Sequence, residues 1–197
     1  MTAEMKDPEI RLPFTYYEQA LITRIHHFYI SEDIGDPMFY TDMIHNIREG
    51  SAGDVIWLHL NTRGGNLTTG VQIINAMSSS AAKIVCSLEG EVHSLGTLIF
   101  LSADEFIVHD NCIMLFHNFS CATSGKGHEQ RQQLNAIEDW FNQLSRAKYI
   151  PFMSEKEFKD MVDGKDIWLG SEEISERLKK MVELQEKEEP TKDISEE

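Results

Sequence analysis

Apolar residues along the chain follow two alternating patterns. Short runs rich in β-branched and aromatic residues have the length of strands, and longer segments carry apolar residues at helical spacing. The predicted strands are residues 26–31, 54–62, 82–90, 105–110 and 112–119, and the predicted helices are residues 36–50, 68–80, 127–150, 154–163 and 171–182. Strands that alternate with helices favour a layered α/β domain with parallel strand pairing.

The composition fits one compact domain and a charged tail. The 197 residues are 41% hydrophobic, which suits one core, and the chain is short for two ordinary domains. The net charge of −15, with no cluster of Lys and Arg, argues against binding to nucleic acid phosphates. Residues 183–197 hold seven acidic residues and two lysines, so we expect a disordered, solubilising tail, with docking of a partner as the alternative.

Signals for export or membrane insertion are absent from the sequence. The N-terminus lacks an apolar segment of secretory type, and the longest apolar run, residues 98–101, is far too short to cross a bilayer. The three cysteines form no CxxC pair, and their odd number suits buried, reduced thiols. We therefore expect a cytoplasmic protein without disulfides or zinc, in which Cys86, Cys112 and Cys121 are free.

Polar residues interrupt the apolar chain in the segment GEVHSLG, residues 90–96. The preceding strand is predicted to end at Gly90 and helical character begins after Ser94, which places Ser94 at a strand-to-helix turn. Most serines at such turns only cap the helix. The alternative is a nucleophile, because the free N–H groups of a helix N-terminus can stabilise a tetrahedral oxyanion. Ser94 alone favours the cap.

A second turn, NTRGGNLTTG at residues 61–70, also joins a predicted strand to a predicted helix. Its adjacent glycines allow backbone N–H groups to point inward without an intervening side chain. Neither this turn nor SGKGHE, residues 124–129, has the spacing of a phosphate-binding loop. The turn is therefore predicted to supply backbone donors without nucleotide chemistry.

A nucleophilic serine also needs a base and an acid that orients the base. His117 lies late in the apolar run IMLFHNF, although most such histidines are hydrogen-bonded core residues. Asp166 lies between a Gly-Lys turn and a second apolar run. The chain order Ser94, His117, Asp166 differs from that of chymotrypsin-like, subtilisin-like and α/β-hydrolase enzymes, and Val92 replaces the first glycine of GxSxG. Those three families are therefore excluded.

Four segments, in this order, resemble the ClpP family of Clp protease proteolytic subunits. They are LNTRGGNLTTGVQIINAM, GEVHSLGTLIFLSA, CIMLFHNFSCATSGKGHEQRQQ and DIWLGSEEISERL. Their order and spacing are far more specific than any one motif. The resemblance covers residues 20–182 and implies a ClpP/crotonase-like α/β fold, a superhelical stack of β-β-α units with a protruding strand-helix handle at residues 118–149. Residues 1–19 take the place of the family's axial loops but look unlike them.

The resemblance implies a serine endopeptidase with a Ser-His-Asp triad. Ser94 would be the nucleophile, His117 the general base and then acid, and Asp166 the carboxylate that holds the imidazole tautomer. The backbone N–H groups of Gly65 and Leu95 would be the oxyanion donors. Peptide bonds would be cleaved through an acyl-enzyme, with no metal or organic cofactor.

Substrates would lie extended along backbone beside the cleft, so cleavage would depend only weakly on their sequence. The candidate contacts are Arg63, Gly64, Asn118 and Phe119. Arg63 stands where the family usually has proline, and Asn118-Phe119 replaces its usual Gln-Pro. These departures add a charge near the substrate path and leave the turn less constrained.

The residues on either side of Ser94 also depart from the family pattern. Leu95 replaces a methionine, which is harmless because the predicted donor is its backbone. His93 replaces a small residue and is a rival general base. We favour His117 because the side chains of adjacent residues diverge in both extended and helical backbone.

The resemblance also implies an assembly. Subunits would form stacked heptameric rings around the active sites, with a separate AAA+ unfoldase using ATP or with a different ClpP-like subunit as partner. Three other functions stay open. They are a viral processing protease of the same fold that cuts one specific protein, an inactive ring component, and a crotonase-type acyl-CoA enzyme.

Overall fold

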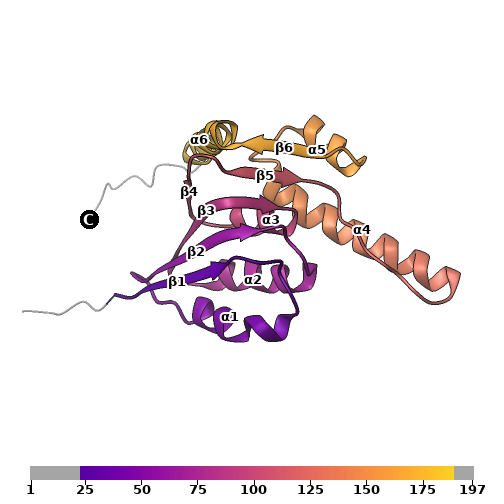
Figure 1. The fold of residues 1–197 in the computed structure, drawn as a ribbon, viewed down its shortest axis with the longest axis horizontal. Helices are drawn as coiled ribbons and strands as arrows, with labels where there is room; N and C mark the ends of the chain where they lie inside the picture. Colours follow the sequence, from indigo (N-terminus) through magenta and orange to yellow (C-terminus); the bar gives the residue numbers. More distant parts are fainter. Residues whose placement is uncertain (1–22, 189–197) are drawn as a thin grey trace, which may run out of the picture.

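A computed structural model of the chain describes residues 23–188. The strands are β1 (Ile25–Ile30), β2 (Val55–Thr62), β3 (Lys83–His93), β4 (Glu105–Val108), β5 (Ile113–Phe116) and β6 (Ile167–Gly170). They form one sheet in the order β1-β2-β3-β5-β6, with β4 also paired to β3 (Figure 1). All pairs are parallel except β5 with β6. The predicted α/β class and parallel pairing are confirmed, and β6 is an additional strand.

Helices precede or follow most of these strands. They are α1 (Thr41–Arg48), α2 (Leu67–Ser79), α3 (Leu95–Phe100), α4 (Gly127–Tyr149), α5 (Glu155–Val162) and α6 (Ser171–Glu188), and a 3-10 turn, η1 (Pro37–Tyr40), leads into α1. The predicted helix 36–50 is therefore divided in two. Pro37 begins η1, since a residue without an N–H suits the first position of a helical segment.

The core lies between α1, α2 and α3 and one face of the sheet. Ile56, Leu58 and Leu60 of β2 point into it and are fully buried, whereas Trp57 and His59 on the alternate face are half-buried. Parallel sheets usually carry helices on both faces. Within residues 23–188 the second face is largely open, and it exposes Ile25, Tyr29, Ile107, Ile113 and Trp168.

Strand β3 continues to His93, past the end that the sequence predicted at Gly90. Its first part pairs with β4 and its last residues pair with β5, so a second partner extends the strand. A Cβ at Gly90 would lie 2.7 Å from the Asn61 Oδ1, so that side chain would have to move if the residue were not glycine. The strand therefore delivers Ser94 directly at its C-terminal end.

The expected handle is present as a long helix without its strand. Figure 1 shows α4 projecting from the body of the molecule. Strand β5 ends at Phe116, short of the predicted 112–119, and residues 117–126 form no strand. Backbone becomes a strand only beside a hydrogen-bonding partner, and no other strand of residues 23–188 pairs with this segment.

The first part of the tail expected at residues 183–197 is helical. Helix α6 extends to Glu188, so residues 183–188 are helical, and residues 189–197 lie outside the described residues. The segment Glu183–Glu188 consists of Glu, Leu, Gln and Lys, which are good helix formers and can continue a helix that buried residues have already anchored. The segment 1–19 also lies outside the described residues.

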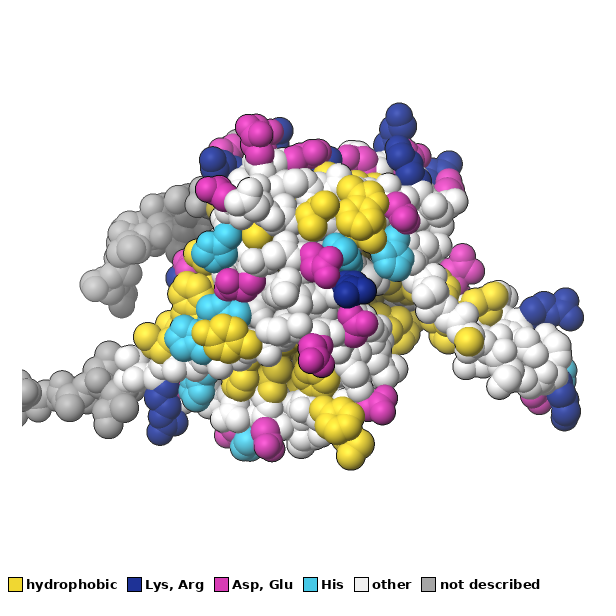
Figure 2. Space-filling model, in the orientation of Figure 1, with side chains coloured by type: hydrophobic (Ala, Val, Ile, Leu, Met, Phe, Trp, Pro, Cys, Tyr) yellow, Lys and Arg dark blue, Asp and Glu magenta, His cyan; other side chains and the backbone are white. Residues whose placement is uncertain are grey.

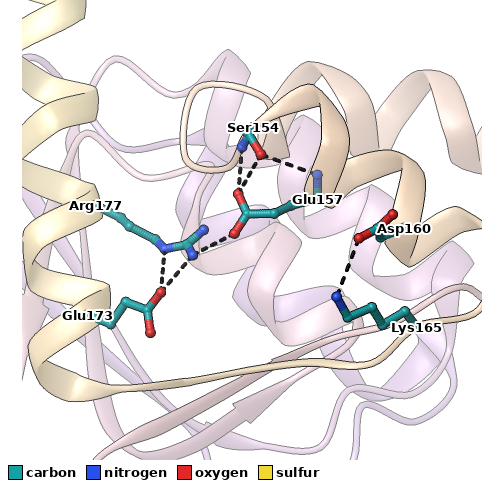
Figure 3. Close-up of polar contacts among 6 residues, drawn as sticks. All are labelled: Ser154, Glu157, Asp160, Lys165, Glu173 and Arg177. Carbon is teal, nitrogen blue, oxygen red and sulfur yellow. Dashed lines mark hydrogen bonds and ion pairs between the residues drawn. The ribbon is translucent and has the colours of Figure 1, made fainter.

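An ion-pair network joins α5 to α6 and so holds β6, which connects them (Figure 3). The Nη2 of Arg177 donates to Oε1 of Glu157 and to Oε1 of Glu173, both at 2.7 Å. Glu157 also forms a capping box with Ser154 at the start of α5. The Arg177 guanidinium is the main reason that the pKa of the Glu157 carboxyl falls from 4.5 to about 2.

Glu157→Gln should lower the free energy of unfolding by about 1.5 kcal/mol at pH 7, the low end for a hydrogen bond to a charged group, since solvent reaches the pair. Folding lowers the pKa of Glu157, so its contribution is complete above the unfolded-state pKa and is lost as the pH falls toward about 2. Urea unfolding at pH 7 and pH 3 measures both effects. The exposed Glu176 provides a control variant, Glu176→Gln, which should match the wild type. An equal deficit of Glu157→Gln at both pH values would contradict the assignment.

Candidate active site

Ser94 lies on a sharp turn between β3 and α3. Its φ of 53° and ψ of −122° are conformations that residues with a side chain rarely adopt. Helix α3 begins at Leu95, yet the Ser94 side chain makes no capping hydrogen bond. The capping interpretation therefore does not account for this serine, whose strained turn instead presents a half-buried hydroxyl.

Hydrogen bonds from three elements hold the Ser94 backbone. The Ser94 N–H donates to the carbonyl of Leu115 in β5, at 2.9 Å. Its carbonyl accepts from the N–H and the hydroxyl of Thr97, at 2.9 and 2.6 Å, and from the hydroxyl of Tyr149, at 3.4 Å. Tyr149 ends α4 and is almost fully buried, and burial raises its pKa, so it acts as a neutral donor. Buried hydrogen bonds of this kind fix the position of the turn.

The glycine turn after β2 is pressed between two other segments. Gly64 has a φ of +96°, and a Cβ there would lie 2.9 Å from the carbonyl oxygen of His93. Gly65 has a φ of +138°, and its Cβ would lie 2.2 Å from the carbonyl oxygen of Ile34. Both positions therefore require glycine for conformation and for space. The glycine turn therefore lies in direct contact with the Ser94 turn.

The backbone N–H groups of Gly65 and Leu95, the predicted oxyanion donors, have no acceptor among the secondary-structure bonds around them. Ile34 donates to the Gly64 carbonyl at 2.6 Å and accepts from the Asn66 N–H at 2.7 Å. This parallel bridge leaves the Gly65 N–H directed away from Ile34. The N–H of Leu95 belongs to the first turn of α3, where no intrahelical acceptor exists. Both residues line one cleft.

This cleft has a volume of about 730 Å³ and also contains Ser94 and His117. It is lined by Arg63, Gly65, Asn66, Leu67, Thr68, Ser94, Leu95, His117, Phe119, Ser120, Cys121, Ala122, Ile137, Trp140 and Phe141. Two of the predicted substrate contacts, Arg63 and Phe119, are therefore at the cleft. Gly64 lies behind Ser94, and the Asn118 side chain instead donates to the carbonyl of Val162 at the end of α5, at 2.8 Å.

His117 follows β5 and is half-buried at the cleft. Its Nδ1 lies 2.5 Å from the backbone carbonyl oxygen of Asn118. No hydrogen bond joins His117 to Ser94 or to Asp166 in this conformation. The structure thus brings the serine and the histidine into one cleft with the imidazole engaged by its own neighbour.

Asp166 is exposed and immediately precedes β6. It is not among the residues that line the cleft. Strands β5 and β6 pair antiparallel, and their ladder ends with Phe116 opposite Ile167. His117 and Asp166 are the next residues beyond that end of the ladder. No hydrogen bond connects their side chains.

The rival base His93 lies away from the cleft. Its ring packs edge-on against Trp168, with centroids 5.2 Å apart, and its Nε2 is 3.6 Å from a carboxylate oxygen of Glu91 without a hydrogen bond. Burial lowers the pKa of His93, and Glu91 only partly opposes this. Glu91 also pairs with Arg63, at 3.2 Å. His93 is therefore a buried neutral ring that packs against Trp168 and does not line the cleft.

For some residues at the site, the sequence carries no signal of their role. Tyr149 and Thr97 hold the Ser94 carbonyl, but a tyrosine at the end of a long helix carries no mark of this contact. Ile137 and Phe141 are apolar residues at helical spacing in the predicted long helix. The sequence did not indicate that they line the cleft together with Trp140.

Neither a cluster of metal ligands nor a membrane-spanning helix occurs among residues 23–188. No group of three or more His, Cys, Asp or Glu side chains in this part of the chain could hold a metal ion. No helix within the described range is both long and apolar enough to span a membrane. The three cysteines are free, with Cys86 and Cys112 buried and Cys121 exposed.

A strained serine turn beside free backbone N–H groups and a histidine is an arrangement typical of serine hydrolases. The chain belongs to the Clp protease family, whose model matches residues 27–177. The comparison with curated proteins gave no match. The family match confirms the resemblance seen in the sequence. It identifies the chain as a ClpP-like peptidase of a serine peptidase family whose members generally form ring oligomers.

Gly65→Ala should lower the free energy of unfolding by roughly 2–4 kcal/mol, because a positive φ and a clash with the Ile34 carbonyl add together. Gly164→Ala is the matched control. Gly164 also has a positive φ, of +102°, but a Cβ there meets no atom within 4 Å, so the cost should be about 1 kcal/mol. Denaturant unfolding of both variants tests this difference, and equal losses would show that the Ile34 contact is not a constraint.

Proposed function

We propose that this chain is a serine endopeptidase in which Ser94 is the nucleophile, His117 the general base and Asp166 the residue that orients His117. The observation that carries the proposal is the Ser94 turn. A positive φ, a hydroxyl without a capping role and two free N–H groups meet at one cleft that also holds His117. Strain of about 1–3 kcal/mol persists at such a position only when the surroundings impose it.

In the proposed reaction the Ser94 Oγ attacks the carbonyl carbon of the scissile peptide while His117 accepts its proton. The negative charge on the carbonyl oxygen is stabilised by the N–H groups of Gly65 and Leu95. His117 then gives the proton to the leaving amine, which releases one product and leaves an acyl-enzyme. Water, activated by His117, hydrolyses the ester and restores Ser94. No metal or organic cofactor takes part.

This chemistry requires His117 to change its hydrogen-bond partner. Its Nδ1 must leave the Asn118 carbonyl and turn to Asp166, so that Nε2 can accept the Ser94 proton. The pairing of β5 and β6 supports this, because its last pair, Phe116 and Ile167, directly adjoins the two residues. A side-chain rotation of His117, without a change in the sheet, is the step that we propose activates the site.

We further propose that substrates are unfolded or translocated polypeptides and that the active sites are enclosed in stacked heptameric rings in the cytoplasm. The projecting α4 (Figure 1) supports contact between subunits, because it leaves Leu134 40% exposed. Any use of ATP would then belong to a separate AAA+ unfoldase. Pairing with another ClpP-like subunit is a variant of this assembly.

A second candidate is an inactive ring component, and it rests on one observation. The His117 Nδ1 is bound to the Asn118 carbonyl, and no hydrogen bond connects the three triad residues. If this arrangement also persists in the assembled protein, Ser94 has no base. The two candidates make opposite predictions for the reactivity of Ser94.

A fluorophosphonate probe should label Ser94 of the purified, assembled protein, because an activated serine attacks its phosphorus centre. Mass spectrometry locates the modified residue. Ser94→Ala and His117→Ala should abolish labelling, whereas Ser120→Ala, a change at another serine in the cleft, should leave it intact. Labelling that survives Ser94→Ala would refute the nucleophile, and a folded oligomer that is never labelled would favour the inactive ring component.

Asp166→Asn should lower kcat for an unstructured peptide by about 10³–10⁴-fold with little change in KM, because the amide favours the wrong imidazole tautomer. The nearby exposed Asp163 gives the control variant Asp163→Asn, which should keep wild-type kinetics. Steady-state peptide hydrolysis measures both. A kcat for Asp166→Asn within a few-fold of the control would exclude Asp166 from the triad.

A further inference from the structure

A row of hydrogen-bonded polar side chains crosses the open face of the sheet. Nδ1 of His27 in β1 lies 3.0 Å from Nε2 of His59 in β2, and Nδ1 of His59 lies 2.6 Å from Oε1 of Glu89 in β3. Figure 2 shows histidine and hydrophobic side chains gathered on this face of the molecule. The row lies outside the cleft that contains Ser94.

The row fixes the protonation of its central ring. A carboxylate only accepts hydrogen bonds, so the short contact with Glu89 places the proton of His59 on Nδ1. His59 thus directs the lone pair of its Nε2 at His27. A carboxylate bound to the far nitrogen of a histidine is the usual support of a metal-binding imidazole.

We propose that His27 Nδ1 and His59 Nε2 together bind a divalent transition-metal ion, with Glu89 as the positioning residue. Two imidazole nitrogens at metal distances of 2.0–2.1 Å and an angle of 90° are separated by about 2.9 Å. The observed separation of 3.0 Å matches this spacing, and both rings must turn to bind the metal, because in the hydrogen bond the N–H of His27 and the lone pair of His59 lie along the line between the two nitrogens. The tautomer of His27 changes, its proton passing from Nδ1 to Nε2.

Aromatic rings pack against both imidazoles and keep them side by side. The Tyr29 ring stacks on His59 at 4.3 Å and 8°, and Trp57 lies beside both imidazoles, 5.9 Å from His27 and 5.8 Å from His59. The His59 side chain is only 14% exposed. Neutral imidazoles favour copper, nickel and zinc over magnesium or calcium. Residues 23–188 supply no third ligand to this pair, so water would complete the coordination.

A metal at this position would join the edge strand β1 to β2. Strand β1 lies at the end of the sheet order and pairs only with β2 among the described strands. A ligand that needs both strands in place binds the folded state and not the unfolded chain, so it raises stability. The bound metal would hold the edge strand β1 against β2, independently of whether Ser94 is catalytic.

Titration of the full-length protein with Zn²⁺ by isothermal calorimetry, and with Cu²⁺ by tryptophan fluorescence, tests this proposal. Cu²⁺ should quench the fluorescence of the adjacent Trp57, and the quenching should disappear in Trp57→Phe. Zn²⁺ should bind with a stoichiometry of about one per chain and raise the thermal midpoint. Glu89→Gln should weaken binding by roughly 10–100-fold, the usual effect of losing such a support.

Two ligand variants and one control make the test decisive. His59→Asn and His27→Asn should each abolish the Trp57-dependent quenching, and His27 is exposed, so its variant should fold even if the half-buried His59 does not tolerate change. His45→Asn, a change at an exposed histidine of α1, should bind like the wild type. Equal affinity in all the histidine variants, or in Glu89→Gln and the wild type, would overturn the proposal.

Discussion

The close approach of two turns is the constraint on which the rest of the site depends. The Gly64-Gly65 turn fits between Ile34 and the Ser94 turn, where any Cβ would overlap backbone. This contact brings the glycine turn beside the start of α3, next to Ser94 with its φ of 53°. Gly64 and Gly65 therefore help to position Ser94, which is not a glycine. The strain at Ser94 is offset by the packing and hydrogen bonds of its neighbours.

The sheet explains why residues far apart in the chain meet at this point. The glycine turn follows β2, Ser94 follows β3 and His117 follows β5, and all three strands are parallel. Loops at the carboxyl ends of parallel strands gather at one edge, which is where α/β proteins usually bind ligands. Strand β6 runs the opposite way, so Asp166 arrives at the same edge from its N-terminal end. One antiparallel strand thus completes the candidate triad.

Much of this arrangement could be predicted from the sequence, because strands and helices alternate clearly and the glycine and serine turns fall between them. The end of β3 was misplaced at Gly90, since glycine usually ends a strand and the second partner strand is visible only in three dimensions. Strand β6 has four residues, which is too few to show alternation. The hydrogen bond between His117 and Asn118 also could not be predicted, because it depends on a side-chain rotation. The residue types in the sequence indicated the chemistry of the candidate site, but they did not indicate how its side chains are aligned.

The contact between Tyr149 and the Ser94 turn links the candidate site to the projecting helix. Tyr149 is the last residue of α4, and its buried hydroxyl bonds both Thr97 and the Ser94 carbonyl, at 2.6 and 3.4 Å. The same helix lines the cleft through Ile137, while its outer part extends beyond the domain core. The helix that projects from the domain therefore also forms part of the cleft wall and holds the backbone of the candidate nucleophile.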